Sequence, residues 1–250
     1  MRISPWSLIL YLLSVDLFDK FSPAIISEMD NGSSIAIDGP VASGKTVIGR
    51  LIANELGYPF LDTGVMYRAI TWFILGQSVA LTDQKTMEDI IQSVNIEVKD
   101  SPDGNTVSIN GSDITQHLRT TAVETTVSRI SEFPFIRKLM VRQQRIMTAN
   151  NSMVLAGRDI GTVVIPEARL KFFLNASSEE RANRRYNQMI ATGEYADWLI
   201  VKHELDIRDQ TDTERLYSPL KIASDAHVID TDSLSIDEVV QEILTIVRKS

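Results

Sequence analysis

Short apolar runs alternate with amphipathic stretches along most of the chain. Runs typical of buried strands occupy residues 34–38, 153–156, 170–174 and 226–229. Elsewhere apolar residues recur at helical spacing, most clearly at Ile48, Leu51, Ile52 and Leu56, and again at Ile236, Val239, Val240, Ile243, Leu244 and Val247. Strands that alternate with helices predict an α/β fold with a central parallel sheet covered on both faces.

Further helices are expected over residues 65–75, 178–189 and 197–209. Gly57 is expected to end the helix that contains Leu56, and Thr192-Gly193-Glu194 marks a break between the last two of these helices.

Residues 79–150 interrupt this alternation and read as an insertion. Asp83 is expected to cap a short helix, and residues 95–99 and 106–110 alternate like two strands around Pro102-Asp103-Gly104-Asn105, a hairpin signal. Two helical stretches follow, with Pro134 placed near a helix start. The chain is therefore expected to form one core, residues 34–78 and 151–250, with an inserted segment of about 79–150.

The first residues differ from the rest. An apolar run at residues 8–13 follows Arg2, but it is too short to span a bilayer, and no convincing cleavage site follows it. Met29 lies five residues before the first strand. Residues 1–33 are expected to be an N-terminal extension, of which 1–28 would precede the true start at Met29; a membrane anchor or export signal is the alternative.

Composition narrows the class of protein. The 250 residues are 44% hydrophobic and 23% charged, as in an average globular protein. The absence of cysteine excludes disulfides, thiolate catalysis and zinc-thiolate sites, and fits a cytoplasmic location. The three histidines are widely spaced, which argues against a histidine metal site, and the net charge of −8 argues against a broad nucleic-acid interface.

The strongest chemical signal is a phosphate-binding loop. Its residues match G-x-x-x-x-G-K-[ST] between a predicted strand and a predicted helix: Gly39, Pro40, Val41, Ala42, Ser43, Gly44, Lys45 and Thr46. The glycines let backbone N–H groups converge on phosphates at the positive end of the helix. Lys45 would reach the β- and γ-phosphates of ATP, and Thr46 would offer its hydroxyl to Mg²⁺. The alternative is a chance glycine-rich turn with a surface lysine.

Arginines near the predicted strand ends suggest a second phosphate. Arg68 follows a glycine-containing turn at a helix start, and Arg158 follows a buried strand in a glycine-bounded loop. An arginine fork binds phosphate oxygens bidentately, and ligands of open α/β sheets bind at the carboxyl ends of the strands. Asp159 could orient the arginine, hold a water on Mg²⁺ or contact the acceptor, and the sequence does not choose among these.

Three further segments carry a family resemblance. Residues 61–68 read Leu-Asp-Thr-Gly-Val-Met-Tyr-Arg, residues 157–164 read Gly-Arg-Asp-Ile-Gly-Thr-Val-Val, and Arg208-Asp209-x-x-Asp212-x-x-Arg215 leads into Ser218-Pro219-Leu220. Together with the phosphate loop, in this order and spacing, they resemble the bacterial cytidylate kinase family from about Ser34 to Val247. The resemblance implies a P-loop NTPase three-layer α/β/α fold with an inserted acceptor-binding domain and a mobile lid at about residues 181–205.

The same resemblance implies a reaction and its residues. ATP with Mg²⁺ would phosphorylate CMP or dCMP, in a chain expected to be a monomer with no nucleic-acid partner and no stable membrane association. Positions that match acceptor-phosphate ligands are Arg68, Arg137 and Arg158. Positions around the base are matched by Thr63, Ser128 and Asp159. Positions near the acceptor are matched by Arg208, Asp212 and Arg215, and among these Asp212 would face the ribose hydroxyls. The arginines of the family's lid are matched by Arg181, Arg184 and Arg185, of which Arg184 would contact the ATP phosphates. The expected catalytic residues are Lys45, Arg158, Arg181 and Arg185.

Some readings stay open at this point. Ala156 stands where the family commonly has an acidic residue. Thr63 and Ser128 could be ordinary cap or turn residues, Arg119 could lie on the surface, and the three lid arginines could form a solvated face that pairs with Glu180. Rival classes are another P-loop kinase acting on adenylate, shikimate or dephospho-coenzyme A, a P-loop switch without kinase turnover, and a degenerate kinase that only binds.

Overall fold

A computed structural model describes residues 34–101, 104–149 and 152–249 of the chain. The predicted extension, with Met29 and the apolar run at 8–13, lies outside the described residues.

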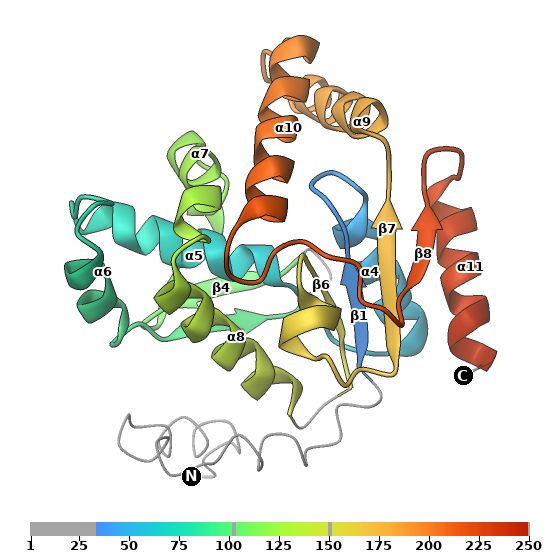
Figure 1. The fold of residues 1–250 in the computed structure, drawn as a ribbon, viewed down its shortest axis with the longest axis horizontal. Coiled ribbons are helices and arrows are strands. Elements are labelled where there is room, and N and C mark those ends of the chain that lie inside the picture. Colours follow the sequence, from blue (N-terminus) through green and yellow to red (C-terminus); the bar gives the residue numbers. More distant parts are fainter. Residues whose placement is uncertain (1–33, 102–103, 150–151, 250) are drawn as a thin grey trace.

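A five-stranded parallel sheet forms the centre of the molecule (Figure 1). Its strands stand in the order β2-β6-β1-β7-β8, with bounds β2 Phe60–Asp62, β6 Val154–Gly157, β1 Ile35–Asp38, β7 Leu170–Asn175 and β8 His227–Asp230. The four predicted strands are confirmed within a residue or so at each end. β2 was missed because its three residues are too few to show a period.

Both faces of the sheet are covered, as the apolar runs predict. Ile35 and Ile37 of β1 pack into one cluster with α4 (Lys45–Leu56) and α11 (Ile236–Lys249). Ala36, between them on β1, belongs to a second cluster on the opposite face with α5 (Thr63–Gly76) and α8 (Pro134–Thr148). Alternate residues of one strand point to opposite faces, so this arrangement gives the predicted three-layer α/β/α architecture.

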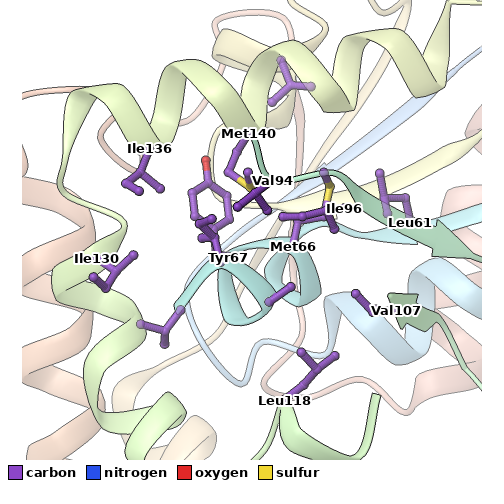
Figure 2. Close-up of a cluster of buried hydrophobic side chains, with 14 of the residues drawn as sticks. Leu61, Met66, Tyr67, Val94, Ile96, Val107, Leu118, Ile130, Ile136 and Met140 are labelled. Atoms are coloured by element: carbon purple, nitrogen blue, oxygen red, sulfur yellow. The ribbon is translucent and has the colours of Figure 1, made fainter. Parts of the chain in front are cut away.

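The inserted segment joins the second cluster rather than forming a separate core. Its elements are α6 (Gln84–Ile91), β3 (Ile96–Lys99), β4 (Thr106–Ile109), β5 (Ser112–Asp113), the 3₁₀ turn η1 (Thr115–His117), α7 (Thr121–Ile130) and α8. The predicted hairpin is confirmed as an antiparallel β3–β4 pair, to which β5 adds a short third strand. Figure 2 shows side chains of β2, α5, the small sheet, α7 and α8 meeting in one cluster.

Two helices stand at the carboxyl end of the sheet, α9 (Ser178–Ala191) and α10 (Trp198–Glu214) (Figure 1). They pack through Ala182, Val201 and Leu205, with Val41 of the phosphate loop against the same cluster. α10 ends five residues later than the predicted 197–209, and Asp212 in the added part is buried. In the described ranges, no helix is both long and apolar enough to cross a bilayer.

Candidate active site

The phosphate loop has the backbone conformation that its glycines require. Gly39 has φ 151°, and a Cβ there would lie 2.3 Å from the carbonyl oxygen of Leu174 on β7. Gly44 has φ 92° and stands immediately before α4. No larger residue fits at Gly39, because the loop passes directly against the neighbouring strand. The loop therefore leads directly into the positive end of α4, and its binding of phosphate through backbone N–H groups stays a prediction.

Lys45 lies inside this loop. Its Nζ donates hydrogen bonds to the carbonyl oxygen of Pro40 and, over 3.2 Å, to Oγ of Ser43, and the residue is 7% exposed. Burial, and then the positive charge of Arg158, hold the pKa of Lys45 well below its ordinary value. A cation held here without an anion is unfavourable, so the arrangement favours a negatively charged ligand.

Thr46 and Asp62 place two side-chain oxygens beside the phosphate loop. Its Oγ1 is exposed beside the loop and lies 2.9 Å from Oδ2 of Asp62, at the end of β2. Among the described residues, no group of three or more His, Cys, Asp or Glu side chains could hold a metal ion. Hydroxyl and carboxylate oxygens suit a cation that takes most of its ligands from phosphates and water.

Asp38, which the sequence reading missed, joins the phosphate loop to the loop of Arg158. Its Oδ1 accepts from the backbone N–H of Ile160 and its Oδ2 from that of Gly161, both at 2.7 Å. These donors lie in the first turn of the π-helix η2 (Ile160–Val164), directly after Arg158 and Asp159. Burial raises the pKa of Asp38 to about 7, against the lowering effect of these two bonds. The ionised carboxylate accepts from both donors, whereas a protonated carboxyl would lose one bond.

We expect this link to appear in the pH profile. Because the folded pKa of Asp38 is above its ordinary 3.8, the protonated form stabilises the fold, and that stability is lost as the pH rises through about 7. The ionised form should be the more active, so kcat should rise as the pH increases through about 7. The Asp38→Asn variant should have a lower kcat. Its plot of kcat against pH should keep only the rise near pH 6, which comes from ionisation of the acceptor phosphate. The same rise in kcat near pH 7 in the variant would contradict a role of Asp38 ionisation in activity.

Arg158 lies opposite the phosphate loop, held by a buried carboxylate. Its Nε donates to Oδ2 of Asp212 over 2.7 Å, and Arg215 donates to Oδ1 of Asp212 over 3.1 Å. Although burial opposes it, the positive charges of Arg158 and Arg215 hold the pKa of Asp212 below its ordinary value. In this structure Asp212 therefore orients two arginines, and its contact with a ribose stays a prediction.

Arg137 and Asp159 form a buried pair beneath this group. Arg137 donates to Oδ2 of Asp159 over 2.5 Å, with side chains 4% and 5% exposed, and its guanidinium lies 5.2 Å from the centre of the Tyr67 ring. Nε of Arg137 and the hydroxyl of Tyr67 have no hydrogen-bond partner within the described chain. Arg137, predicted to bind the acceptor phosphate, is thus brought beside Asp159, the residue predicted to contact the base.

Thr63 and Ser128 occupy different places. Oγ1 of Thr63 donates to the carbonyl oxygen of Ala156 over 2.9 Å, which ties the start of α5 to β6. Ser128 is half-buried on α7, one turn after Glu124. Ala156 itself is 1% exposed and packs in the apolar cluster beneath α4, so a carboxylate at this position would need a partner at the edge of that cluster.

Arg68 and Arg208 share an anion that the sequence did not predict. Nε of Arg68 donates to Oε1 of Glu124 over 2.7 Å, and NH1 of Arg208 lies 3.6 Å from Oε2 of the same carboxylate. Burial first, and then the charges of Arg158 and Arg68, lower the pKa of Arg208 to about 10. No local signal identifies Glu124, because its partners are 56 and 84 residues away along the chain.

The three arginines of α9 point in different directions. Arg181 is buried, donates to the carbonyl oxygen of Val41 in the phosphate loop over 3.2 Å, and pairs with Asp209 at 2.5 Å. Arg184 pairs with Glu180, the alternative that helical spacing suggests, and binds Thr231 after β8. Arg185 donates to Gln188 on its own helix. Only Arg181 contacts the phosphate loop, and a role of the other two in phosphate binding stays a prediction.

This geometry defines a class of protein: a P-loop phosphotransferase, in which a phosphate-binding loop faces a cluster of arginines across the carboxyl ends of a five-stranded parallel sheet. The family model described as cytidylate kinase matches residues 35–249. The chain belongs to the cytidylate kinase family.

Curated cytidylate kinases align with this chain over almost their whole length. A cytidylate kinase of Geobacillus sp. is 46% identical over 221 residues, which cover 88% of this chain and 99% of the relative. A cytidylate kinase of Anoxybacillus flavithermus is 44% identical over 88% of this chain and 98% of the relative. A cytidylate kinase of Geobacillus kaustophilus is also 44% identical, over 86% of this chain and 96% of the relative. The resemblance inferred from the sequence motifs is confirmed.

Proposed function

We propose that this protein transfers the γ-phosphate of ATP to CMP or dCMP and yields ADP and CDP or dCDP. One observation carries the proposal beyond family membership. Lys45 of the phosphate loop and Arg158 of the acceptor-side cluster lie close enough for the charge of one to lower the pKa of the other. They follow neighbouring strands, since Asp38 of β1 is in register with Gly157 of β6. Two phosphate-binding groups that face each other suit transfer between two phosphates.

The chain's own residues would bring two anions together. Lys45 and the loop N–H groups hold the β- and γ-phosphates, and the arginines hold the acceptor phosphate. An oxygen of the acceptor phosphate bonds to the γ-phosphorus while the bond to the β–γ bridging oxygen breaks, and ADP leaves with that oxygen. The acceptor phosphate is already an anion, so no general base is needed. Mg²⁺, held by Thr46 with Asp62 nearby, would neutralise charge on the β- and γ-phosphates.

The acceptor side can read a base as well as a phosphate. The pair of Arg137 and Asp159 offers an unpartnered Nε and a carboxylate in a buried place, which suits a flat polar base edge. Ser128 lies on the adjoining helix α7. Arg208, Asp212 and Arg215 are proposed for the sugar and phosphate. On closure, α9 and α10 would bring Arg184 and Arg185 over the γ-phosphate and exclude water, a competing acceptor.

The test measures ADP formation from ATP and Mg²⁺ with CMP, dCMP, UMP, AMP, shikimate or no acceptor in parallel. We expect turnover with CMP and dCMP that exceeds the rate without acceptor by at least a factor of about 10³, and none when Mg²⁺ is chelated. Turnover that does not depend on an acceptor would instead indicate an ATPase or switch. Preference for AMP or shikimate would indicate another small-molecule kinase.

Two further features belong to the proposal. The chain has no cysteine and uses ATP, which supports a cytoplasmic location in a reducing compartment. We also propose that the protein is a monomer. Light scattering at the enzyme's working concentration would test this, with a dimer mass as the contrary result.

A further inference from the structure

Glu124 connects three elements around the proposed acceptor site. It lies on α7, and its carboxylate contacts Arg68 of α5 and Arg208 of α10, at 2.7 and 3.6 Å. Its side chain is 22% exposed, so solvent reaches it from one side. Although burial raises the pKa of Glu124, the charge and hydrogen bond of Arg68 hold it below its ordinary value, so the carboxylate is ionised at neutral pH.

The surroundings of Glu124 carry an excess of positive charge. A small hollow adjoins it, lined by Arg119 and Arg185 as well as by the second carboxylate Glu194. Arg158 lies near Arg208, whose pKa its charge helps to lower, but Arg158 itself pairs with Asp212. Glu124 alone pairs with both Arg68 and Arg208 among the ion pairs of the described residues, and its second oxygen remains 3.6 Å from Arg208, beyond ordinary hydrogen-bond distance.

An anion with more charge and more oxygens would satisfy these arginines better. A phosphate monoester carries up to two negative charges and three terminal oxygens, and it accepts bidentate bonds from arginine. Glu124 could not stay beside such a group without repulsion, because both would be negative and only a few ångströms apart. Only one of the two anions can therefore occupy the forks of Arg68 and Arg208.

We infer that Glu124 is a stand-in anion, which holds Arg68 and Arg208 while no acceptor is bound and is displaced by the acceptor phosphate. The inference rests on the proposed function, in which these arginines bind that phosphate. Displacement breaks the ion pairs that tie α7 to α5 and α10 but leaves the apolar packing of α7 against α5, so arrival of the acceptor rearranges the polar contacts of the helix that carries Ser128. Glu124 thereby lowers the affinity for the acceptor and keeps the arginines paired when the site is empty.

The test compares Glu124→Gln with the unsubstituted protein by calorimetry. Glutamine keeps the shape of the side chain and an oxygen that accepts from Arg68, but it removes the charge. We expect the Kd of CMP to fall by about tenfold, because one nearby like charge has been removed. The Kd of cytidine, which has no phosphate, should stay unchanged. In turnover, KM for CMP should fall while kcat changes by less than about twofold, since Glu124 makes no contact with the reacting groups.

Glu88→Gln is the matched control. Glu88 is exposed on α6, so this variant changes the net charge equally without touching Arg68 or Arg208, and its CMP affinity should equal that of the parent. If Glu124→Gln proves unstable, Glu124→Ala serves, with thermal unfolding as the check on its fold.

The alternative is that Glu124 positions Arg68 for the acceptor. In that case Glu124→Gln would weaken CMP binding or leave it unchanged, and the inference would fall. An equal gain for cytidine, or an equal gain in Glu88→Gln, would also overturn it. Failure of the proposed function is a separate result, because the unsubstituted protein would then neither bind nor phosphorylate CMP.

Discussion

Lys45→Ala is expected to lower kcat with CMP by about 10²–10³-fold, the usual loss when one group that stabilises transition-state charge is removed. The chain should remain folded. The two hydrogen bonds of Lys45 are to Pro40 and Ser43 of its own loop, so the variant breaks no hydrogen bond that joins this loop to another described element. Its removal also relieves a buried position that disfavours the ammonium, since burial lowers the pKa of this lysine.

Steady-state kinetics and thermal unfolding check this expectation together. Lys85→Ala, at an exposed position of α6, is the control and should keep the activity of the parent. Near-normal turnover by a folded Lys45→Ala protein would remove the phosphate loop from the mechanism. A small or positive change in Tm, with the large loss of kcat, would show that this residue serves chemistry rather than the fold.

The second large effect is expected at the buried pair of Arg137 and Asp159. Arg137→Met should reduce the free energy of unfolding by about 3–5 kcal/mol, because it leaves the carboxylate of Asp159 buried without its partner. Methionine keeps most of the volume of the side chain and its contact with the ring of Tyr67. Urea unfolding at pH 7 measures the change, and a loss of less than about 1 kcal/mol would contradict the contact.

A double variant separates stability from function at this pair. Arg137→Met with Asp159→Leu places two apolar side chains where the ion pair lies, and such replacements are often neutral in stability. We therefore expect the double variant to regain most of the lost free energy of unfolding. Turnover with CMP should stay low, since no polar group would remain to meet the base edge. Restored stability together with restored activity would assign the pair a structural role alone.

Local patterns in the sequence were sufficient for much of the fold. The apolar runs predicted four of the five strands of the central sheet, and helical periodicity predicted α4 and α11, because these signals lie within a few consecutive residues. The hairpin of β3 and β4 and the cap at Asp83 were predicted for the same reason. The three residues of β2 were too few to show any period, and the π-helix η2 has no comparable sequence signal.

The candidate site also has parts that local sequence patterns predicted and parts that they did not. The phosphate loop is eight consecutive residues whose glycines, lysine and threonine determine its conformation and chemistry, so the sequence alone predicted it. The acceptor-side arginines came from motifs that resemble a family, and the family is confirmed. Their partners could not be read from the motifs, since Asp38 meets Gly161 across 123 positions and Glu124 meets Arg68 across 56.

The direction of each arginine on α9 shows what tertiary structure decides. Arg181 and Arg184 differ by less than a turn of helix, yet one contacts the phosphate loop and the other binds Thr231 beyond β8. The sequence by itself determined the class of fold, the phosphate loop and the set of cationic residues, because these are local patterns of shape and charge. Only the packing of distant elements decided which cation meets which anion, because a charge acts through space and its neighbours in space are distant in the chain.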